Sequence, residues 1–126
     1  MKFILSLLTL VVSAFTSSCT NAQTKPIEAI TWNKAIELSK QPDFLLLDVR
    51  TAGEVKKGAV PGAVVIDFFD DAFLSKAKKV IGTKKVIVFC HSGGRSSEAA
   101  TKLTNAGITV MEVPEGYAKY LLKEKP

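Results

Sequence analysis

The stretch VIVFCHSGGRSS, residues 86–97, decides how this chain folds. An apolar run rich in β-branched residues ends at Cys90, and two glycines, an arginine and two serines follow it. A short continuous apolar run of this kind predicts a strand that is covered on both faces, as in a parallel sheet. The glycines predict a tight loop, and Ser96 or Ser97 predicts the start of a helix. We therefore expect Cys90 at the carboxyl end of a buried strand, where parallel sheets bind their ligands.

The rest of the chain repeats this alternation of apolar runs and helical patterns, which predicts an α/β domain with a largely parallel sheet. Its 126 residues suffice for one domain with a single core. The expected strands are residues 27–30, 44–48, 64–66, 85–89 and 110–113. The expected helices are residues 31–40, 51–58, 70–79, 96–106 and 117–123. Around the third helix, we expect four apolar side chains to face inward: Phe69, Phe73, Leu74 and Ala77.

Polar residues follow three of the expected strands. Asp48 and Arg50 stand at the end of the second strand, and Asp67 directly follows the third. Because the carboxyl ends of parallel strands share one edge of the sheet, we expect these side chains beside the loop that follows Cys90. That edge is the predicted ligand site.

The loop after Cys90 has the composition of an anion site. A loop that curls around its own first side chain points successive backbone N–H groups inward, and the following helix adds the positive end of its dipole. Both effects lower the pKa of a thiol, and the thiolate is the reactive nucleophile. Arg95 adds a permanent positive charge. The sequence thus predicts a nucleophilic cysteine in place of an inert, buried one.

Residues 1–18 have the architecture of an export signal. A lysine precedes an apolar run that is too short to span a membrane, and small residues follow. TSSC resembles a bacterial lipoprotein signal, so we expect cleavage before Cys19, a lipid on its thiol and a polar tether over residues 19–26. Cleavage after Ala22 and an uncleaved anchor stay open. We expect the mature protein in the periplasm or cell envelope, attached to the membrane by its lipid.

Cysteine usage and charge narrow the function classes. Lipidation or removal of Cys19 leaves Cys90 as a single thiol, which forms no intramolecular disulfide and is a liability in an oxidising compartment unless it has a function. The chain has 17 Lys and Arg against 12 Asp and Glu, a formal net charge of +5. Its lysines are scattered and lack interleaved aromatics, so we expect attraction of small anions and no nucleic-acid partner.

Four motifs, in the same order, resemble those of the rhodanese superfamily. CHSGGRS, from Cys90, is similar to the C-x-x-G-x-R active-site loop, and LLLDVR is similar to the family's first strand with its D-x-R ending. The segment from Glu54 through GAVPGA resembles the E-x-x-x-G-H-I-P-G-A signature, and VPEGYAKYL resembles the closing G-G-W/Y segment. The resemblance covers residues 27–123 and implies a three-layer α/β domain over residues 27–126, with a five-stranded sheet between helices.

The resemblance also implies a sulfurtransferase that works by double displacement. The Cys90 thiolate takes a sulfur atom from an anionic donor such as thiosulfate and passes it to cyanide, a thiol or a protein. Cys90 and Arg95 are the implied catalytic residues, and Arg95 also binds the donor. The implied substrate-binding loop consists of His91, Ser92, Gly93, Gly94 and Ser96. The implied supports, an ion-pair network that braces the loop, are Asp48, Arg50 and Glu54. The family needs neither a metal nor an organic cofactor.

Loop length separates sulfur chemistry from phosphate chemistry. Phosphatases and arsenate reductases related to this fold have one residue more between the cysteine and the arginine than the four found here. The shorter loop favours one extra sulfur atom over a tetrahedral oxyanion. A phosphatase or arsenate reductase is therefore the weaker catalytic alternative, and a non-catalytic persulfide carrier or partner-binding module is another.

Three residues depart from the family pattern. His91 stands where many members that use thiosulfate have a basic residue, which leaves the preference for thiosulfate open. Ala59 replaces a histidine, and Glu115 replaces the first closing glycine. We expect these changes to tune activity without abolishing it.

Overall fold

The structure is a computed structural model that describes residues 24–124, and all structural statements below concern that part of the chain. The five strands are β1 (Glu28–Ala29), β2 (Phe44–Asp48), β3 (Val64–Val65), β4 (Lys85–Phe89) and β5 (Val110–Glu112). The five helices are α1 (Trp32–Ser39), α2 (Ala52–Lys56), α3 (Phe73–Ile81), α4 (Gly94–Asn105) and α5 (Gly116–Glu124). Within residues 24–124, no helix is both long and apolar enough to cross a membrane.

The five strands form one sheet in the order β1-β5-β4-β2-β3, and every pair is parallel. The predicted parallel α/β fold is therefore confirmed. β4 and β2, the two longest strands, lie side by side with Asp48 opposite Phe89. Because these two strands end together, the loop after β4 begins directly beside the loop after β2.

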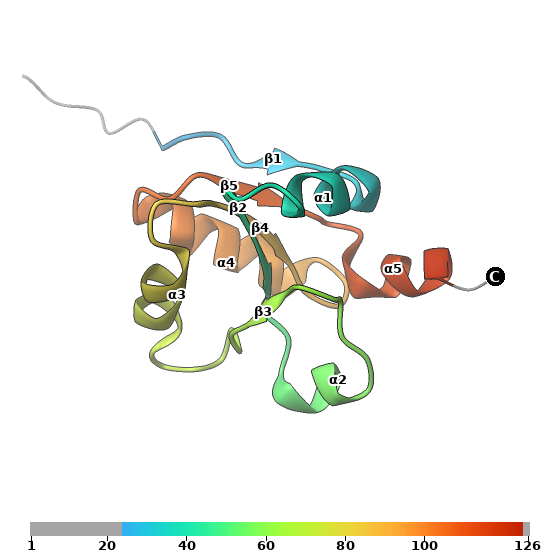
Figure 1. Ribbon diagram of the computed structural model, residues 1–126. Helices are drawn as coiled ribbons and strands as arrows, with labels where there is room; N and C mark the ends of the chain where they lie inside the picture. Colours follow the sequence, from blue (N-terminus) through green and yellow to red (C-terminus); the bar gives the residue numbers. More distant parts are fainter. Residues whose placement is uncertain (1–23, 125–126) are drawn as a thin grey trace, which may run out of the picture.

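Helices cover both faces of the sheet, which gives the three layers visible in Figure 1. The core on one face joins sheet residues such as Val88 and Cys90 to the buried sides of α3 and α4. The core on the other face joins Phe89 and Ile87 to α1 and α5. The short helix α2 lies apart from both layers, beyond the carboxyl end of β2 (Figure 1).

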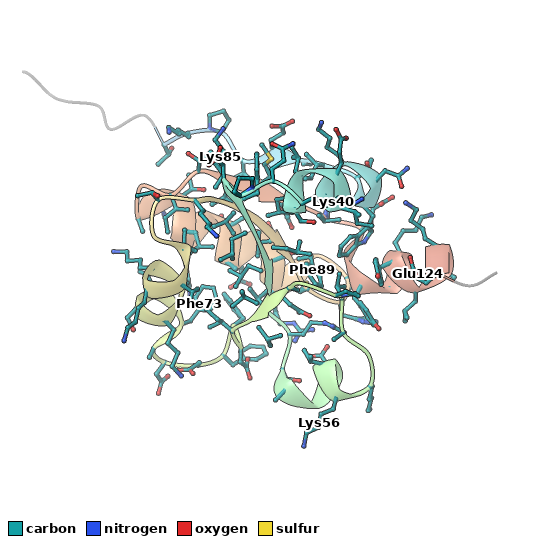
Figure 2. The ribbon with its side chains drawn as sticks, in the orientation of Figure 1. Lys40, Lys56, Phe73, Lys85, Phe89 and Glu124 are labelled. Carbon is teal, nitrogen blue, oxygen red and sulfur yellow. The ribbon has the colours of Figure 1, made fainter. Side chains whose placement is uncertain are left out.

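The starts of α3 and α4 differ most from the sequence prediction. α3 begins at Phe73, not at residue 70, because the carboxylates of Asp67 and Asp70 accept hydrogen bonds from the backbone N–H groups of Phe69 and Ala72 and hold this segment in turns. The prediction that Phe69 faces inward is wrong, since its side chain is 67% exposed. Phe73 does face the core, and Figure 2 shows it on the side of α3 toward the sheet.

α4 begins two residues earlier than predicted, at Gly94. Gly93 precedes it in a left-handed conformation, which ends the loop sharply enough for the helix to start at once. Ser96 therefore belongs to the first turn of the helix, where its side chain is buried, and neither Ser96 nor Ser97 caps the helix. This shift decides what Ser96 does in the site.

Candidate active site

Cys90 follows the last residue of β4 and is 1% exposed. It is the one cysteine of the described residues, and it is a free thiol. The preceding residue, Phe89, lies near the centre of the molecule in Figure 2 and packs edge-on against Trp32. The thiol is thus held at the end of a strand that is fixed in the interior of the sheet.

The loop after Cys90 wraps around the sulfur. The Gly93 N–H donates to Cys90 Sγ over 3.1 Å. In the conformation that makes this hydrogen bond, Gly93 has a φ of 102°. A Cβ on Gly93 would lie 2.6 Å from the carbonyl oxygen of Pro114. Glycine is needed at this position for both reasons, whereas Gly94 has ordinary helical geometry and open space around it.

The first turn of α4 supplies the second contact to the sulfur. Ser96 Oγ lies 3.5 Å from Cys90 Sγ, and the serine is fully buried. Burial raises the pKa of Cys90, but hydrogen bonding with the Ser96 side chain and with the backbone N–H groups of Ser96, Gly93 and Ser92 outweighs it, so the pKa of the thiol is lowered overall. The loop can therefore hold a thiolate, as its sequence predicts.

The start of α5 fixes the loop from its other side. The N–H groups of Tyr117 and Ala118 donate to the carbonyl oxygens of Cys90 and His91 over 2.8 and 3.0 Å. This contact places Gly116 at a φ of 63°, with no room for a side chain, because a Cβ would lie 2.2 Å from the His91 oxygen. With these carbonyls held away from Sγ, the loop's N–H groups are free to face it.

Sequence reasoning missed the role of Gly116, although its signal was present in the closing VPEGY segment. Of the two closing positions, the one that keeps glycine is the one that contacts the loop. Glu115, at the substituted position, is exposed, and so is Ala59. Both substituted side chains therefore lie outside the packed interior.

Arg95 and Glu54 form the outer support of the loop. The guanidinium donates from Nη1 and Nη2 to the two carboxylate oxygens over 2.6 and 2.7 Å. This hydrogen bonding holds the pKa of Glu54 well below its usual range and raises that of Arg95. Glu54 is itself placed by the predicted capping box, in which it exchanges hydrogen bonds with Thr51 at the start of α2.

Asp48 and Arg50 form a second, separate pair, rather than one network with Glu54. Arg50 is 1% exposed, and its Nη2 donates to Asp48 over 2.7 Å and to the Gly58 carbonyl over 3.0 Å. Its guanidinium also lies 3.8 Å from the centroid of the Tyr117 ring. Since Tyr117 binds the carbonyl of Cys90, this pair supports the loop indirectly.

The remaining predicted site residues lie at the rim. His91 and Ser92 are exposed, and His91 borders a hollow of about 380 Å³ together with Lys57, Tyr117 and Leu121. Asp67 lies at the same edge, half-buried. Across residues 24–124, no three His, Cys, Asp or Glu side chains are grouped so that they could hold a metal ion. Cys19 lies outside the described residues.

One carboxylate in the site was not predicted at all. Glu112, the last residue of β5, places its Oε1 2.9 Å from Ser96 Oγ. It reaches the site because β5 lies next to β4, with Val88 opposite Glu112. No local sequence signal marks this residue, because its position depends on the order of the strands.

Comparisons with known proteins show what the chain as a whole is similar to. A family model described as "Rhodanese-like domain" matches residues 31–123. The chain is 34% identical over 85 residues to "Thiosulfate sulfurtransferase 16, chloroplastic" of Arabidopsis thaliana, a match that covers 59% of this chain and 71% of the plant protein. It is 29% identical over 70 residues to a "Sulfurtransferase" of Allochromatium vinosum, covering 56% of this chain and 64% of the bacterial one. Among solved structures, a rhodanese-related protein from Thermoplasma volcanium superposes with a TM-score of 0.66 at 25% identity, over 79% of this chain and 95% of its own.

Proposed function

Because the chain belongs to the family of rhodanese-like domains, we propose that it is a sulfurtransferase that carries the transferred sulfur as a persulfide on Cys90. The similar proteins named as sulfurtransferases support this class of reaction. The observation that carries the proposal is the sulfur of Cys90 itself, which is buried and bound by the Gly93 N–H at 3.1 Å. A site that binds a negative sulfur suits both a thiolate and a persulfide.

The first half of the proposed reaction loads the sulfur. The Cys90 thiolate attacks the outer sulfur of thiosulfate or a similar anionic donor. The donor's sulfur–sulfur bond breaks, its electron pair leaves with sulfite, and Cys90 becomes a persulfide. The N–H groups of the loop stabilise the negative sulfur before and after this step, and Arg95 attracts the anionic donor.

The second half of the proposed reaction transfers the sulfur from Cys90 to an acceptor. A nucleophilic acceptor (cyanide, a thiolate or a thiolate of another protein) attacks the outer sulfur of the persulfide. The bond between Sγ and the outer sulfur breaks, its electron pair returns to Sγ, and the thiolate is regenerated. No electrons are gained or lost overall, so the reaction requires no redox partner.

The size of the loop favours sulfur over phosphate. Within the four residues between Cys90 and Arg95, one position is already the start of α4, and Cys90 is 1% exposed. An additional sulfur atom requires far less space than a phosphoryl group. A phosphatase or arsenate reductase is therefore the weaker hypothesis for the function of this site.

Uptake of sulfur tests the proposal. The protein incubated with thiosulfate, or with another sulfane donor, should gain the mass of one sulfur atom, which cyanide or a reducing agent removes. Cys90→Ser should gain nothing, and Ser97→Ala, which changes the exposed serine next to Ser96, should load normally. If no donor loads the wild-type protein while its fold is intact, sulfur transfer is the wrong function.

A persulfide carrier is the second candidate, and the burial of Cys90 favours it because a shielded persulfide is kept from water and small nucleophiles. Enzyme and carrier differ in turnover. An enzyme releases many equivalents of thiocyanate from thiosulfate and cyanide, whereas a carrier binds one equivalent of sulfur and releases it to a specific partner. Counting product per protein distinguishes the two.

We also propose that the protein is exported and attached to a membrane by a lipid on Cys19, in a periplasmic or cell-envelope location. The support is the sequence of residues 1–19, which lie outside the described residues. Mass spectrometry of the native N-terminus tests this. A diacylated cysteine at the terminus is the expected result, and an unmodified terminus at Gln23 would exclude the lipid.

A further inference from the structure

The side chain of Ser96 lies between Cys90 and Glu112. Its Oγ is 3.5 Å from Cys90 Sγ, 2.9 Å from Glu112 Oε1 and 3.1 Å from the Gly93 carbonyl oxygen. Ser96 is fully buried, so these groups are its partners in place of bulk water. A hydroxyl carries a single hydrogen. Three acceptors therefore compete for one hydrogen.

When Cys90 is a thiol, the competition has one favourable outcome. Of the three acceptors, Glu112 is the nearest to Ser96 Oγ and the only carboxylate, so Ser96 donates its hydrogen to Glu112. The lone pairs of Ser96 Oγ then accept the hydrogen of the Cys90 thiol. The result is a continuous chain of hydrogen bonds from Cys90 through Ser96 to Glu112.

When Cys90 is a thiolate, the chain no longer works. The sulfur has no hydrogen, so Ser96 must turn its own hydrogen toward Sγ in order to stabilise the charge. Glu112 then loses its partner in a half-buried position and faces a second negative charge nearby. A persulfide differs from a thiolate, because its negative charge is on the outer sulfur and the inner Sγ needs no hydrogen from Ser96.

We propose that Glu112 is a positioning residue that acts through Ser96: it draws the serine hydrogen away from Sγ, disfavours the free thiolate of Cys90 and thereby favours the sulfur-loaded form. Glu112 thus opposes the loop's N–H groups, which favour the thiolate. Loss of the carboxylate makes Cys90 more reactive when empty and a better leaving group when loaded. The statement about the loaded form rests on the proposed function, whereas the statement about the free thiol does not.

Other charged groups lie around the same site, and the test must leave them unchanged. Arg95 is a cation whose charge interacts with Cys90, and it is paired with Glu54 and influenced by Asp67. The Asp48–Arg50 pair is closed and buried at the end of the neighbouring strand, and His91 is exposed at the rim. None of these groups contacts Glu112 through a hydrogen bond or ion pair within residues 24–124, so a substitution there alters Ser96 first.

Alkylation of Cys90 by a small reagent, followed across pH on the full chain, tests the inference without any sulfur transfer. Glu112→Gln keeps the shape and removes the charge. We expect it to react about threefold to tenfold faster than wild type on the acidic side of the profile, the factor that corresponds to one hydrogen bond of ordinary strength. Its profile should shift to lower pH. Glu98→Gln, which removes a charge from an exposed position on the same helix as Ser96, should follow the wild-type profile.

A second test asks whether Glu112 acts through Ser96, and it uses Ser96→Ala as the starting variant. In Ser96→Ala, where no hydroxyl connects the two groups, adding Glu112→Gln should change the rate by less than about twofold. Glu112→Asp, which keeps the charge but shortens the side chain, serves if the glutamine variant folds poorly, and it should behave like Gln. The inference is overturned if Glu112→Gln reacts as wild type or more slowly, if Glu98→Gln produces the same shift, or if the shift persists in Ser96→Ala.

Sulfur release separates this inference from the proposed function. Protein loaded with sulfur should lose it to a thiol acceptor faster in Glu112→Gln than in wild type. If neither protein takes up sulfur but the alkylation profiles shift as described, the proposed function fails and the role of Glu112 in setting the state of Cys90 stands.

Discussion

Arg95 and Glu54 lie 41 residues apart in the sequence and form a two-pronged ion pair with N–O distances of 2.6 and 2.7 Å. The pair ties the loop around Cys90 to the start of α2. The Glu54 side chain is 33% exposed, so water screens part of this interaction. Arg95 therefore has a fixed position at the rim of the site, and its charge is partly balanced before any substrate arrives.

Glu54→Gln should lower the free energy of unfolding at neutral pH by about 1 kcal/mol, after allowance for screening. Because Arg95 lowers the pKa of Glu54 in the folded state, this contribution is present above the unfolded pKa, about 4.3, and is lost as pH falls toward the folded value. Urea unfolding at several pH values measures the difference, which should shrink below about pH 4.3. Glu37→Gln, which breaks a 3.5 Å pair whose carboxylate is 67% exposed, is the matched control and should change little at any pH.

Gly116→Ala should both destabilise the protein and disturb the loop. The added Cβ would lie 2.2 Å from the His91 oxygen at a positive φ, so we expect a loss of about 2–3 kcal/mol and altered alkylation of Cys90. Gly107→Ala is the control, since Gly107 has a φ of 87° but nothing within 4 Å of a Cβ. It should cost about 1 kcal/mol and leave Cys90 unaffected. Equal behaviour of the two variants would contradict the steric role of Gly116.

Asp48→Asn should destabilise the protein by about 3 kcal/mol, because it leaves the buried guanidinium of Arg50 without its charged partner. Thermal and urea unfolding measure the loss. Asp70→Asn breaks the pair with Lys76 at the surface and should leave the stability close to that of wild type. A similar, small effect of both substitutions would show that the buried pair is not a structural support.

Phe73→Ala should cost about 3–5 kcal/mol, whereas Phe69→Ala should change stability by no more than about 0.5 kcal/mol. Phe73 is 3% exposed and belongs to the core under α3, while Phe69 is 67% exposed. Urea unfolding of both variants measures the difference. A large loss for Phe69→Ala would restore the sequence-based expectation that this ring is buried.

The contrast between these two phenylalanines shows what the sequence alone could not predict, namely which of the two side chains is buried. The sequence prediction had both side chains facing inward, Phe73 on the helix over residues 70–79 and Phe69 directly before it. The turns made by the carboxylates of Asp67 and Asp70 delay the helix until Phe73, and Phe69 therefore turns outward. The competition between a side-chain hydrogen bond and a helical one is a local effect, but its outcome depends on how the segment packs.

The sequence by itself determined the strand, the loop and the helix around Cys90. A continuous apolar run, two glycines and the residues after them act over a few positions, and each has a direct physical meaning for the backbone. The capping box of Thr51 and Glu54 was equally local and was confirmed.

Only the tertiary structure decided which distant groups meet the sulfur. Glu112 reaches Ser96 because β5 lies beside β4. Gly116 touches His91 because α5 begins shortly after the end of β5. Strand order results from the packing of two helical layers on one sheet, and no short stretch of sequence encodes it. The cysteine and its loop were therefore readable from the sequence, whereas the carboxylate that we propose sets its state was not.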